Sequence, residues 1–507
     1  MARELIVANR RKDNAQLELK VLLDPSRNNP WETFISDVLP RLYDWERDLI
    51  YSINIGANRW MTDRDYIDTF ASEPPANAPL LGMQGPNVIF AGSEDHILTV
   101  APTGAGKGQC HIVPSLIRLT SVSAFVLDIK NGENHTLTSA IRRHVIRFDP
   151  SDPARSHMYN PMDFVSDDPL NIWSDARQLA DLINSTDERD HWTERARDWI
   201  AGLIMAERLH PEDGKRPNLT RVADFFYSSE ADEQRRIVEM EISGRKPLQR
   251  VANDMRRTNE KERSSIISSA RRSMDIWTDQ AIEHVTSGRS DWHPFDLRLE
   301  SDNSESLGVY VCIPQNKIAA YRSLLRVLVG QHISALLNPP KVLPPNVSLS
   351  KNPAFFILDE FPQLGYMESI EQAAELGRSA HIRLWLFAQN LGQIRSIYSN
   401  AEGMISLCSF QAFMNINDPE TEEYVIRKLG DTESVMDEGR HPLVGRGELS
   451  GPKWRDHFVC FKRNALPMRV RKIPAHAIPV LKGVMDLGCL EHDPVAKHAS
   501  LLTPMET

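Results

Sequence analysis

Two groups of residues, far apart in the chain, have the types and spacing that phosphate chemistry requires. The first is the run Ala101–Gly108 (APTGAGKG), which follows the apolar stretch His96–Val100 and precedes an apolar, helix-like segment. Small residues let backbone N–H groups converge on phosphate oxygens, a lysine reaches the outer phosphates, and the start of a helix favours an anion. We therefore predict a phosphate-binding loop whose binding residues are Thr103, Gly104, Ala105, Gly106, Lys107 and Gly108.

This loop departs from the usual GxxxxGK[ST] pattern at two positions. Ala101 stands where the first glycine is expected, and Gly108 stands where a Ser or Thr hydroxyl would contact magnesium. The first change is sterically mild. The second removes a metal ligand that water or a carboxylate elsewhere would have to replace. Taken alone, the run is also compatible with a glycine-rich turn that carries a surface lysine.

The second group is an acidic pair at the end of an apolar run, Ala354–Leu358 followed by Asp359 and Glu360. In phosphoryl transfer an acidic residue at such a strand tip holds magnesium, and a neighbouring carboxylate polarises the attacking water. We assign Asp359 the metal and Glu360 the water. An acidic pair after a buried strand is also common as a plain loop start, but a phosphate-binding loop upstream favours the chemical interpretation.

Two further residues are candidates for the same reaction. The apolar run Arg383–Ala388 ends in Gln389-Asn390, and an amide at a neighbouring strand tip can sense the γ-phosphate or orient water. A capping asparagine is the alternative for this dipeptide. Arg378 lies in a helix-like stretch before that run and is a candidate arginine finger for an adjacent subunit. A solvated helix arginine explains it equally well.

Short apolar runs that alternate with helical patterns indicate the scaffold that holds these residues. Such a rhythm is typical of an α/β fold with a mostly parallel sheet and helices on both faces. From about 168 to 295 only helical periodicity is found, which predicts an inserted all-α domain. The expected strands are Asn87–Ala91, His96–Val100, Ala124–Leu127, His144–Phe148, Ser306–Ile313, Ala354–Leu358, Arg383–Ala388 and Ser409–Asn415.

This reading divides the chain into four parts. We predict an N-terminal segment (1–80), an α/β nucleotide-binding domain (81–167 and 296–480), the all-α domain (168–295) and a polar C-terminal tail (481–507). If the protein needs a docking element, residues 1–80 are the candidate, on position alone.

Composition limits the environment and the partners. The 507 residues include five cysteines, none in a CxxC pair, which argues against a zinc site or a disulfide framework and favours a reducing cytosol. No stretch approaches the roughly 20 apolar residues of a membrane span. The net charge of -10 means that any nucleic-acid contact needs a local basic surface. Candidate clusters are Arg142-Arg143, Arg256-Arg257, Arg271-Arg272 and Arg469–Lys472, each of which solvation or a salt bridge also explains.

Several longer blocks, in this order, resemble the coupling proteins of type IV secretion systems, of the TraG/TraD kind. The resemblance covers roughly residues 88–475, and in such proteins a glycine commonly follows the P-loop lysine, so Gly108 fits the family. The blocks are VLDIKNGEN (Val126–Asn134), FDPSDPARSHMYNPMDF (Phe148–Phe164), HWTERARDWIAGLI (His191–Ile204), SSIISSARRSMDIWTDQAIEHVTSGRSDW (Ser264–Trp292), VYVCIPQNKIAAYRSLLRVLVGQ (Val309–Gln331) and LDEFPQLG (Leu358–Gly365).

The resemblance implies a RecA-like P-loop NTPase domain, an all-α domain that faces the cargo, and a homo-hexamer with ATP sites between subunits. It implies ATP and Mg²⁺ as ligands, with Lys107 on phosphate, Asp359 on the metal, Glu360 on water and Arg378 at a neighbouring site. It places Asp128 and Lys130 beside the nucleotide without a defined role. Family members usually carry N-terminal transmembrane helices, which this sequence does not show. We expect a cytoplasmic chain that a membrane partner recruits, a relative with another task, or an anchor outside this sequence.

The leading functional interpretation is an ATP-hydrolysing motor that recruits and pumps DNA or a relaxase nucleoprotein for conjugative or type IV secretion transfer. A secretion-channel or membrane-anchor protein is the expected partner. One alternative is a DNA-translocating ATPase outside secretion, in defence or element mobilisation. Another is a nucleotide-gated adaptor with little hydrolysis, which the missing hydroxyl at Gly108 favours.

Overall fold

The computed structural model describes most of the chain between residues 59 and 488. Within that range it leaves out 63–64, 67–68, 71–76, 86, 93, 143, 185–190, 212–213, 301–305, 344–346 and 434–439. Most of the proposed docking segment 1–80 and residues 489–507 of the predicted tail lie outside the described residues. Among the residues described, no helix combines the length and the apolar character that a bilayer crossing requires.

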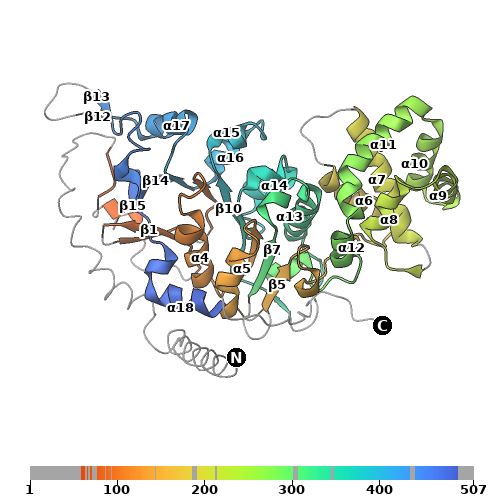
Figure 1. Cartoon of the computed structure of the whole chain (residues 1–507), viewed down its shortest axis with the longest axis horizontal. Coiled ribbons are helices and arrows are strands. Elements are labelled where there is room, and N and C mark those ends of the chain that lie inside the picture. The colour runs from red at the N-terminus through yellow and green to blue at the C-terminus, as the bar shows by residue number, and fades with distance from the viewer. Residues whose placement is uncertain are drawn as a thin grey trace.

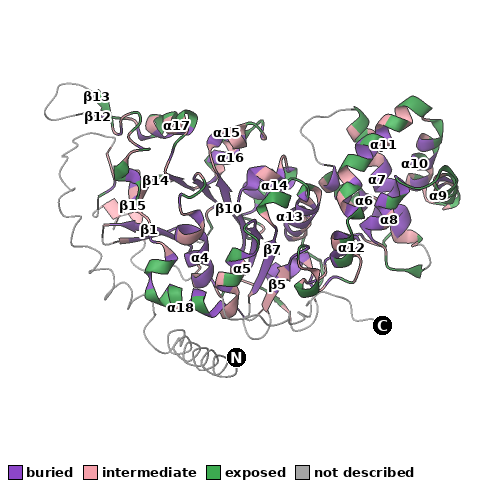
Figure 2. Cartoon of the chain, in the orientation of Figure 1, coloured by how far each residue is buried: buried purple, intermediate pink, exposed green. Residues whose placement is uncertain are grey.

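A single large sheet organises the α/β part, with the strand order β2-β1-β15-β14-β11-β3-β10-β9-β4-β7-β5 (Figure 1). Its parallel strands, apart from the half-buried edge strand β5, are buried on both faces, as Figure 2 shows, which explains why their sequences are mostly apolar. They are β3 (Ile97–Val100), β4 (Ala124–Asp128), β5 (His144–Phe148), β7 (Leu307–Cys312), β9 (Ala354–Leu358), β10 (Ile382–Ala388) and β11 (Phe410–Met414). Each matches a strand expected from the sequence.

An antiparallel extension continues the sheet beyond β11, and of its strands the sequence predicted only Asn87–Ala91, which is β2. It consists of β14 (His457–Lys462), β15 (Met468–Arg471), β1 (Leu80–Gln84) and β2 (Asn87–Phe90). The run Arg469–Lys472 overlaps β15, whose residues alternate between buried and half-buried. Two separate pairs of short strands are β6 (Leu299–Glu300) with β8 (Ser348–Leu349), and β12 (Asp431–Glu433) with β13 (Arg440–Pro442).

Helices pack on the sheet and shield its parallel part. They are α4 (Val113–Arg118), α5 (Glu133–Thr138), α13 (Arg322–Leu337), α14 (Glu368–Leu376), α15 (Leu391–Arg395), α16 (Ala401–Leu407), α17 (Pro419–Leu429) and α18 (Pro479–Gly488). Helix α18 differs from the sequence prediction, because residues 481–488 had been placed in a polar tail. Its Leu481 and Val484 are buried, and the helix packs against α5. An apolar stripe, spaced as in a helix, is the signal that was overlooked.

Helices α6 to α12 form a separate body at one side of the molecule (Figure 1). They are α6 (Ile172–Ile183), α7 (His191–Leu209), α8 (Leu219–Phe225), α9 (Glu230–Ile242), α10 (Lys246–Arg257), α11 (Glu260–Met274) and α12 (Gln280–Thr286). No strand occurs among the residues described between 168 and 295, in keeping with an all-α insertion. The boundaries of the predicted domains stay a prediction.

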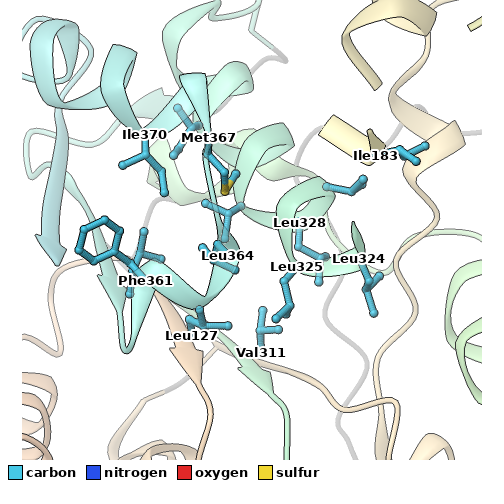
Figure 3. Packing of buried hydrophobic residues seen from close by; sticks show 14 of the residues in the cluster. Leu127, Ile183, Val311, Leu324, Leu325, Leu328, Phe361, Leu364, Met367 and Ile370 are labelled. Carbon is cyan, nitrogen blue, oxygen red and sulfur yellow. The ribbon is translucent and has the colours of Figure 1, made fainter. Parts of the chain in front are cut away.

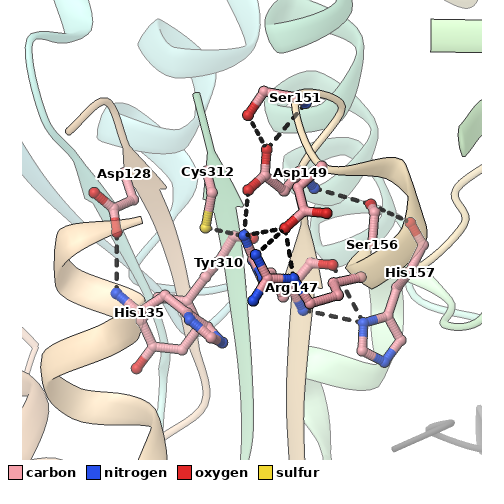
Figure 4. A network of polar contacts seen from close by, with 11 residues as sticks. Asp128, His135, Arg147, Asp149, Ser151, Ser156, His157, Tyr310 and Cys312 are labelled. Carbon is pink, nitrogen blue, oxygen red and sulfur yellow. Dashed lines mark hydrogen bonds and ion pairs between the residues drawn. The ribbon is translucent and has the colours of Figure 1, made fainter. Parts of the chain in front are cut away.

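The chain enters and leaves this helical body through two segments that are bonded to each other. The backbone N–H of Tyr159 donates to Val285 O at 2.9 Å, and that of Met158 donates to Asp291 Oδ2 at 2.7 Å. Just before them, Arg147 Nη2 at the end of β5 contacts Asp149 Oδ2 at 2.6 Å, in the polar network of Figure 4. Two chain segments that are hydrogen-bonded to each other therefore connect the helical body to the sheet.

Candidate nucleotide site

The phosphate-binding loop leaves the carboxyl end of β3, near the middle of the sheet. Gly104 and Gly106 have φ angles of 80° and 96°, a left-handed conformation that side chains disfavour. Lys107 begins the helix that continues as a π-helical turn, Gly108–Ile112, and then as α4. The sequence thus forms the strand, glycine-rich turn and helix that a phosphate site requires.

The acidic pair reaches the same place from another strand. Strand β10 lies between β3 and β9 and is parallel to both, so the three carboxyl ends meet at one edge of the sheet. Lys107 Nζ bonds Glu360 Oε1 and lies 4.0 Å from Asp359 Oδ1. All three side chains are at most 8% exposed. One lysine and two carboxylates from distant parts of the sequence therefore form one buried cluster.

Glu360 has a strained backbone, with φ 52° and ψ 42° in the left-handed region. A non-glycine residue in this conformation costs on the order of 1 kcal/mol or more and is common at functional sites. The short 3₁₀ helix Phe361–Leu364 begins directly after it, with Pro362 in its first turn. This turn sends the chain sharply away from β9 and leaves the Glu360 side chain directed at Lys107.

The acidic pair has unused ligand capacity, which fits a divalent metal. Asp359 Oδ1 and Glu360 Oε2 are buried and accept no hydrogen bond from the described residues. Burial raises the pKa of Asp359 to about 6, although nearby Lys107 opposes this shift. No group of three or more His, Cys, Asp or Glu side chains with metal-binding geometry occurs in the described part of the chain. Mg²⁺ suits such a site, because it binds through one or two carboxylates and fills its shell with water and substrate phosphates.

Replacing Asp359 with asparagine is expected to stabilise the nucleotide-free protein at pH 8. The folded-state pKa, about 6, lies above the ordinary value of 3.8, so the folded protein retains a proton that the unfolded chain has lost. That stabilisation is complete below about pH 4 and is lost as the pH rises through 6, whereas asparagine never ionises. The shift predicts a gain of about 2–3 kcal/mol in the free energy of unfolding at pH 8.

Urea titrations of both proteins at pH 8 and pH 5, without Mg²⁺ or nucleotide, measure this gain. The difference should shrink towards pH 5, where the wild-type carboxyl is partly protonated. An equal difference at both pH values would show that the asparagine acts by a route other than charge. The same substitution should weaken Mg²⁺-dependent nucleotide binding, since it removes the carboxylate charge.

Asp128 and Lys130, at the end of β4 next to β9, also contribute to this edge. Burial raises the pKa of Asp128 to about 6, and its Oδ2 accepts the backbone N–H of His135 at 3.0 Å (Figure 4). A Cβ placed on Gly108 would lie 3.5 Å from Lys130 Nζ. The Lys130 amino group therefore lies next to the position that a Ser or Thr side chain would occupy in the usual P-loop pattern. The sequence placed this block near the nucleotide but did not identify that contact.

The two remaining candidate residues, Gln389 and Arg378, lie at opposite ends of strand β10. Gln389 lies at the tip of β10, between the P-loop strand and the strand of the acidic pair. Its neighbour Asn390 caps α15 by accepting the N–H of Gln393 at 2.9 Å, so the capping interpretation holds for that residue. Arg378 lies before β10, at the opposite end of the sheet from Lys107. There it pairs with Glu94 and Asp95 at 3.6 and 3.9 Å, and in its own subunit it does not join the cluster.

Comparison with known proteins shows to which family the chain belongs. Residues 57–440 match the family model described as "Type IV secretory system Conjugative DNA transfer". The chain belongs to this family. The coupling-protein resemblance seen in the sequence is thereby confirmed.

Two similar proteins show how much of the chain is shared. Protein VirD4 of Agrobacterium fabrum (strain C58 / ATCC 33970) is 31% identical over 354 residues, which are 67% of this chain and 50% of the relative. Conjugal transfer protein TraG of Escherichia coli is 28% identical over 379 residues, 70% of this chain and 59% of the relative. The chain therefore spans between half and three fifths of the length of these curated relatives.

A solved structure confirms the predicted fold class for this family member. The plasmid coupling protein TrwB, in complex with a non-hydrolysable ATP analogue, superposes with a TM-score of 0.63 at 19% sequence identity. The match covers 83% of this chain and 95% of that chain. The α/β fold, a mostly parallel RecA-like sheet with an all-α insertion, is thus shared with a coupling protein.

Proposed function

We propose that this chain is an ATP-hydrolysing coupling motor that recruits and pumps DNA or a nucleoprotein for conjugative or type IV secretion transfer. The observation that carries the proposal is the buried contact of Lys107 with Glu360 beside Asp359. A relative that is 28% identical is named for conjugal transfer. TrwB, which shares the fold, has been solved with an ATP analogue and with ADP and Mg²⁺.

In the proposed reaction Lys107 has two successive partners. Without nucleotide its charge is balanced by Glu360. The γ-phosphate of ATP then competes for Lys107, because a lysine ammonium is a strong phosphate ligand. Glu360 is released and accepts a proton from the attacking water. Mg²⁺, held through Asp359, would neutralise the charge that develops on the phosphates.

The proposed assembly is a homo-hexamer with nucleotide between subunits. Arg378 is far from the P-loop of its own chain and is exposed, with 63% of its side chain accessible. A role in hydrolysis therefore requires that it acts on the ATP of a neighbour. Gln389, at the tip of the strand between β3 and β9, would sense the γ-phosphate in the same subunit.

ATPase activity with and without DNA tests the proposal. We expect hydrolysis that requires Mg²⁺ and that DNA stimulates. An adaptor with little hydrolysis is the second candidate, which Gly108 favours because the loop lacks a metal-binding hydroxyl. No turnover under assembling conditions, with or without DNA, would favour the adaptor and reject the motor.

The cargo and the partners are proposals of the same kind. We propose DNA or a relaxase nucleoprotein as cargo, and a secretion-channel or membrane-anchor protein that recruits the motor to the inner membrane. A pull-down from cells with Glu360→Gln, held on ATP, tests both. Recovery of DNA without any secretion protein would favour a DNA-translocating ATPase outside secretion.

A further inference from the structure

The basic clusters that the sequence singled out do not all face solvent. Arg142 is buried and donates to backbone carbonyls of the α4–β4 connection. Arg256 pairs with Glu241 at 2.7 Å, and Arg271 donates to a backbone carbonyl at 2.7 Å. These residues stabilise the protein itself. Arg272 is different, because it lines a cavity at the junction of the helical body and α13.

This cavity, here called the interdomain cleft, has a volume of about 720 Å³. Its walls come from the end of α6 at Ile183, from the stretch 272–279 of the helical body, and from residues 317–326, which lead into α13. Ser323 Oγ of α13 donates to Ile183 O at 3.3 Å, where the helical body meets the α/β part, and Figure 3 shows Ile183 on the side of α13 that carries Leu324. The cleft therefore lies on the junction between the two parts of the chain.

The charge of the cleft is opposite to that of the whole chain. Four basic side chains line it, Arg272, Lys317, Arg322 and Arg326, against two acidic ones, Asp275 and Asp279. Both acids are engaged, since Asp275 Oδ1 accepts the Tyr227 hydroxyl at 3.1 Å and Asp279 caps α12. In a chain of net charge -10, this is a local basic surface of the kind that phosphates require.

Three of these cations have no acidic partner. Within the part of the chain that the structure describes, Arg272, Lys317 and Arg322 form no ion pair, although other arginines of the helical body do. Among the described residues, the Lys317 ammonium contacts the Tyr321 hydroxyl and ring, at 3.3 and 5.5 Å. Positive side chains gathered around a cavity without counter-charges favour an anionic ligand.

We propose that the interdomain cleft binds the phosphate backbone of single-stranded DNA, the cargo of the proposed motor. The inference rests on that proposed function and adds the site at which the cargo binds. A volume of about 720 Å³ is typical of sites for single small molecules, so it admits a nucleotide-sized length of one strand. Arginine and lysine contacts to phosphate carry no sequence information, which suits a motor that must move any sequence.

The cleft is also linked to the reactive carboxylate. Arg322 Nε donates to Gln363 O at 3.0 Å, and Arg326 Nε donates to Leu364 O at 2.6 Å. These carbonyls belong to the 3₁₀ turn that directly follows Glu360. In Figure 3 the turn residue Leu364 lies between Phe361 and the α13 residues Leu325 and Leu328. DNA bound in the cleft would contact Arg322 and Arg326, which also donate hydrogen bonds to this turn. Cargo binding would therefore fix the position of Glu360.

A pair of double variants tests the proposal. Arg272→Ala with Lys317→Ala removes two positive charges from the cleft. Arg250→Ala with Lys261→Ala removes the same charge from exposed positions of α10 and α11, away from the cleft. Fluorescence anisotropy of a labelled oligothymidylate at several salt concentrations gives the affinity, and thermal unfolding verifies that each variant is folded.

We expect the cleft variant to bind DNA at least about tenfold more weakly than the control variant, and equally so for oligothymidylate and oligoadenylate. The slope of log K against log salt should fall by about 1.4 in magnitude, or about 0.7 for each lost phosphate contact. Equal losses in both double variants, or no loss in either, would overturn the proposal. A cleft variant that binds DNA as tightly as the control variant but binds one ATP fewer would also overturn the proposal, because the cleft would then be a site for free nucleotide.

The wild-type protein separates failure of this inference from failure of the proposed function. If it hydrolyses ATP and binds DNA while the cleft variant behaves like the control, only the cleft assignment is wrong. If the wild type binds no DNA at any salt concentration, both the assignment and the proposed cargo are wrong.

Discussion

Replacing Glu360 with glutamine is expected to lower the rate of ATP hydrolysis by about 10²–10⁴-fold while ATP binding is retained. Glutamine keeps the size of the side chain but cannot accept a proton from water. It also weakens the contact with Lys107, which the carboxylate holds in the nucleotide-free protein. Because ATP must displace Glu360 from Lys107, the variant should bind ATP at least as tightly as the wild type.

Single-turnover hydrolysis and titration with a fluorescent ATP analogue measure the two effects separately. Glu375→Gln is the matched control, since Glu375 is exposed on α14 and the substitution removes the same charge. A variant that hydrolyses ATP at the wild-type rate would exclude Glu360 as the general base. A variant with weaker ATP binding would contradict the exchange of partners at Lys107.

The site could be predicted from sequence because its parts are local. The P-loop and the Asp359–Glu360 pair are each short runs at the end of an apolar strand, and parallel strands bring such ends to one edge of a sheet. The contact between Lys107 and Glu360 follows from that rule, although 253 positions separate the two residues. Their chemical roles stay predictions, as do those of Gln389 and Arg378.

Features that depend on distant packing could not be predicted in this way. The approach of Lys130 to Gly108 depends on how the turn Gly108–Ile112 lies relative to β4, which two other strands separate from β3, and no local pattern encodes this. The ion pairs of Arg378 with Glu94 and Asp95 arise because the amino ends of β3 and β10 are adjacent. The interdomain cleft combines residues of the helical body with the start of α13, more than 40 positions later in the chain.

Two strands of the antiparallel extension, β14 and β15, could not be predicted for a different reason. Strands β14 and β15 are short and carry arginine and lysine, so β15 was read as a basic cluster rather than as a strand. In the sheet, Met468 and Val470 are buried while Arg469 and Arg471 are only half-buried. That alternation is a strand signal of period two, and it competes with the charge pattern in so short a run.

Replacing Lys107 with alanine is expected to abolish measurable ATP binding and also to destabilise the nucleotide-free protein. Lys107 is the cation that balances two buried carboxylates, and its side chain is only 8% exposed. Removing one partner of a buried ion pair costs about 3–5 kcal/mol, because the remaining charge is left without compensation. The loss should be greatest above pH 6, where Asp359, with its pKa raised to about 6, is ionised.

A double variant, Lys107→Met with Glu360→Gln, separates the two consequences of losing Lys107. It removes the Lys107–Glu360 pair and keeps the volume of the side chains, so part of the stability should return, while Asp359 keeps its buried charge at pH 8. ATP binding should remain absent, because no cation is left at the P-loop to meet the γ-phosphate. Urea titration at pH 8 and ATP titration provide the two measurements, with Lys351→Ala as an exposed control. A double variant that is stable and still binds ATP would show that Lys107 balances the acidic pair and has no part in holding the nucleotide.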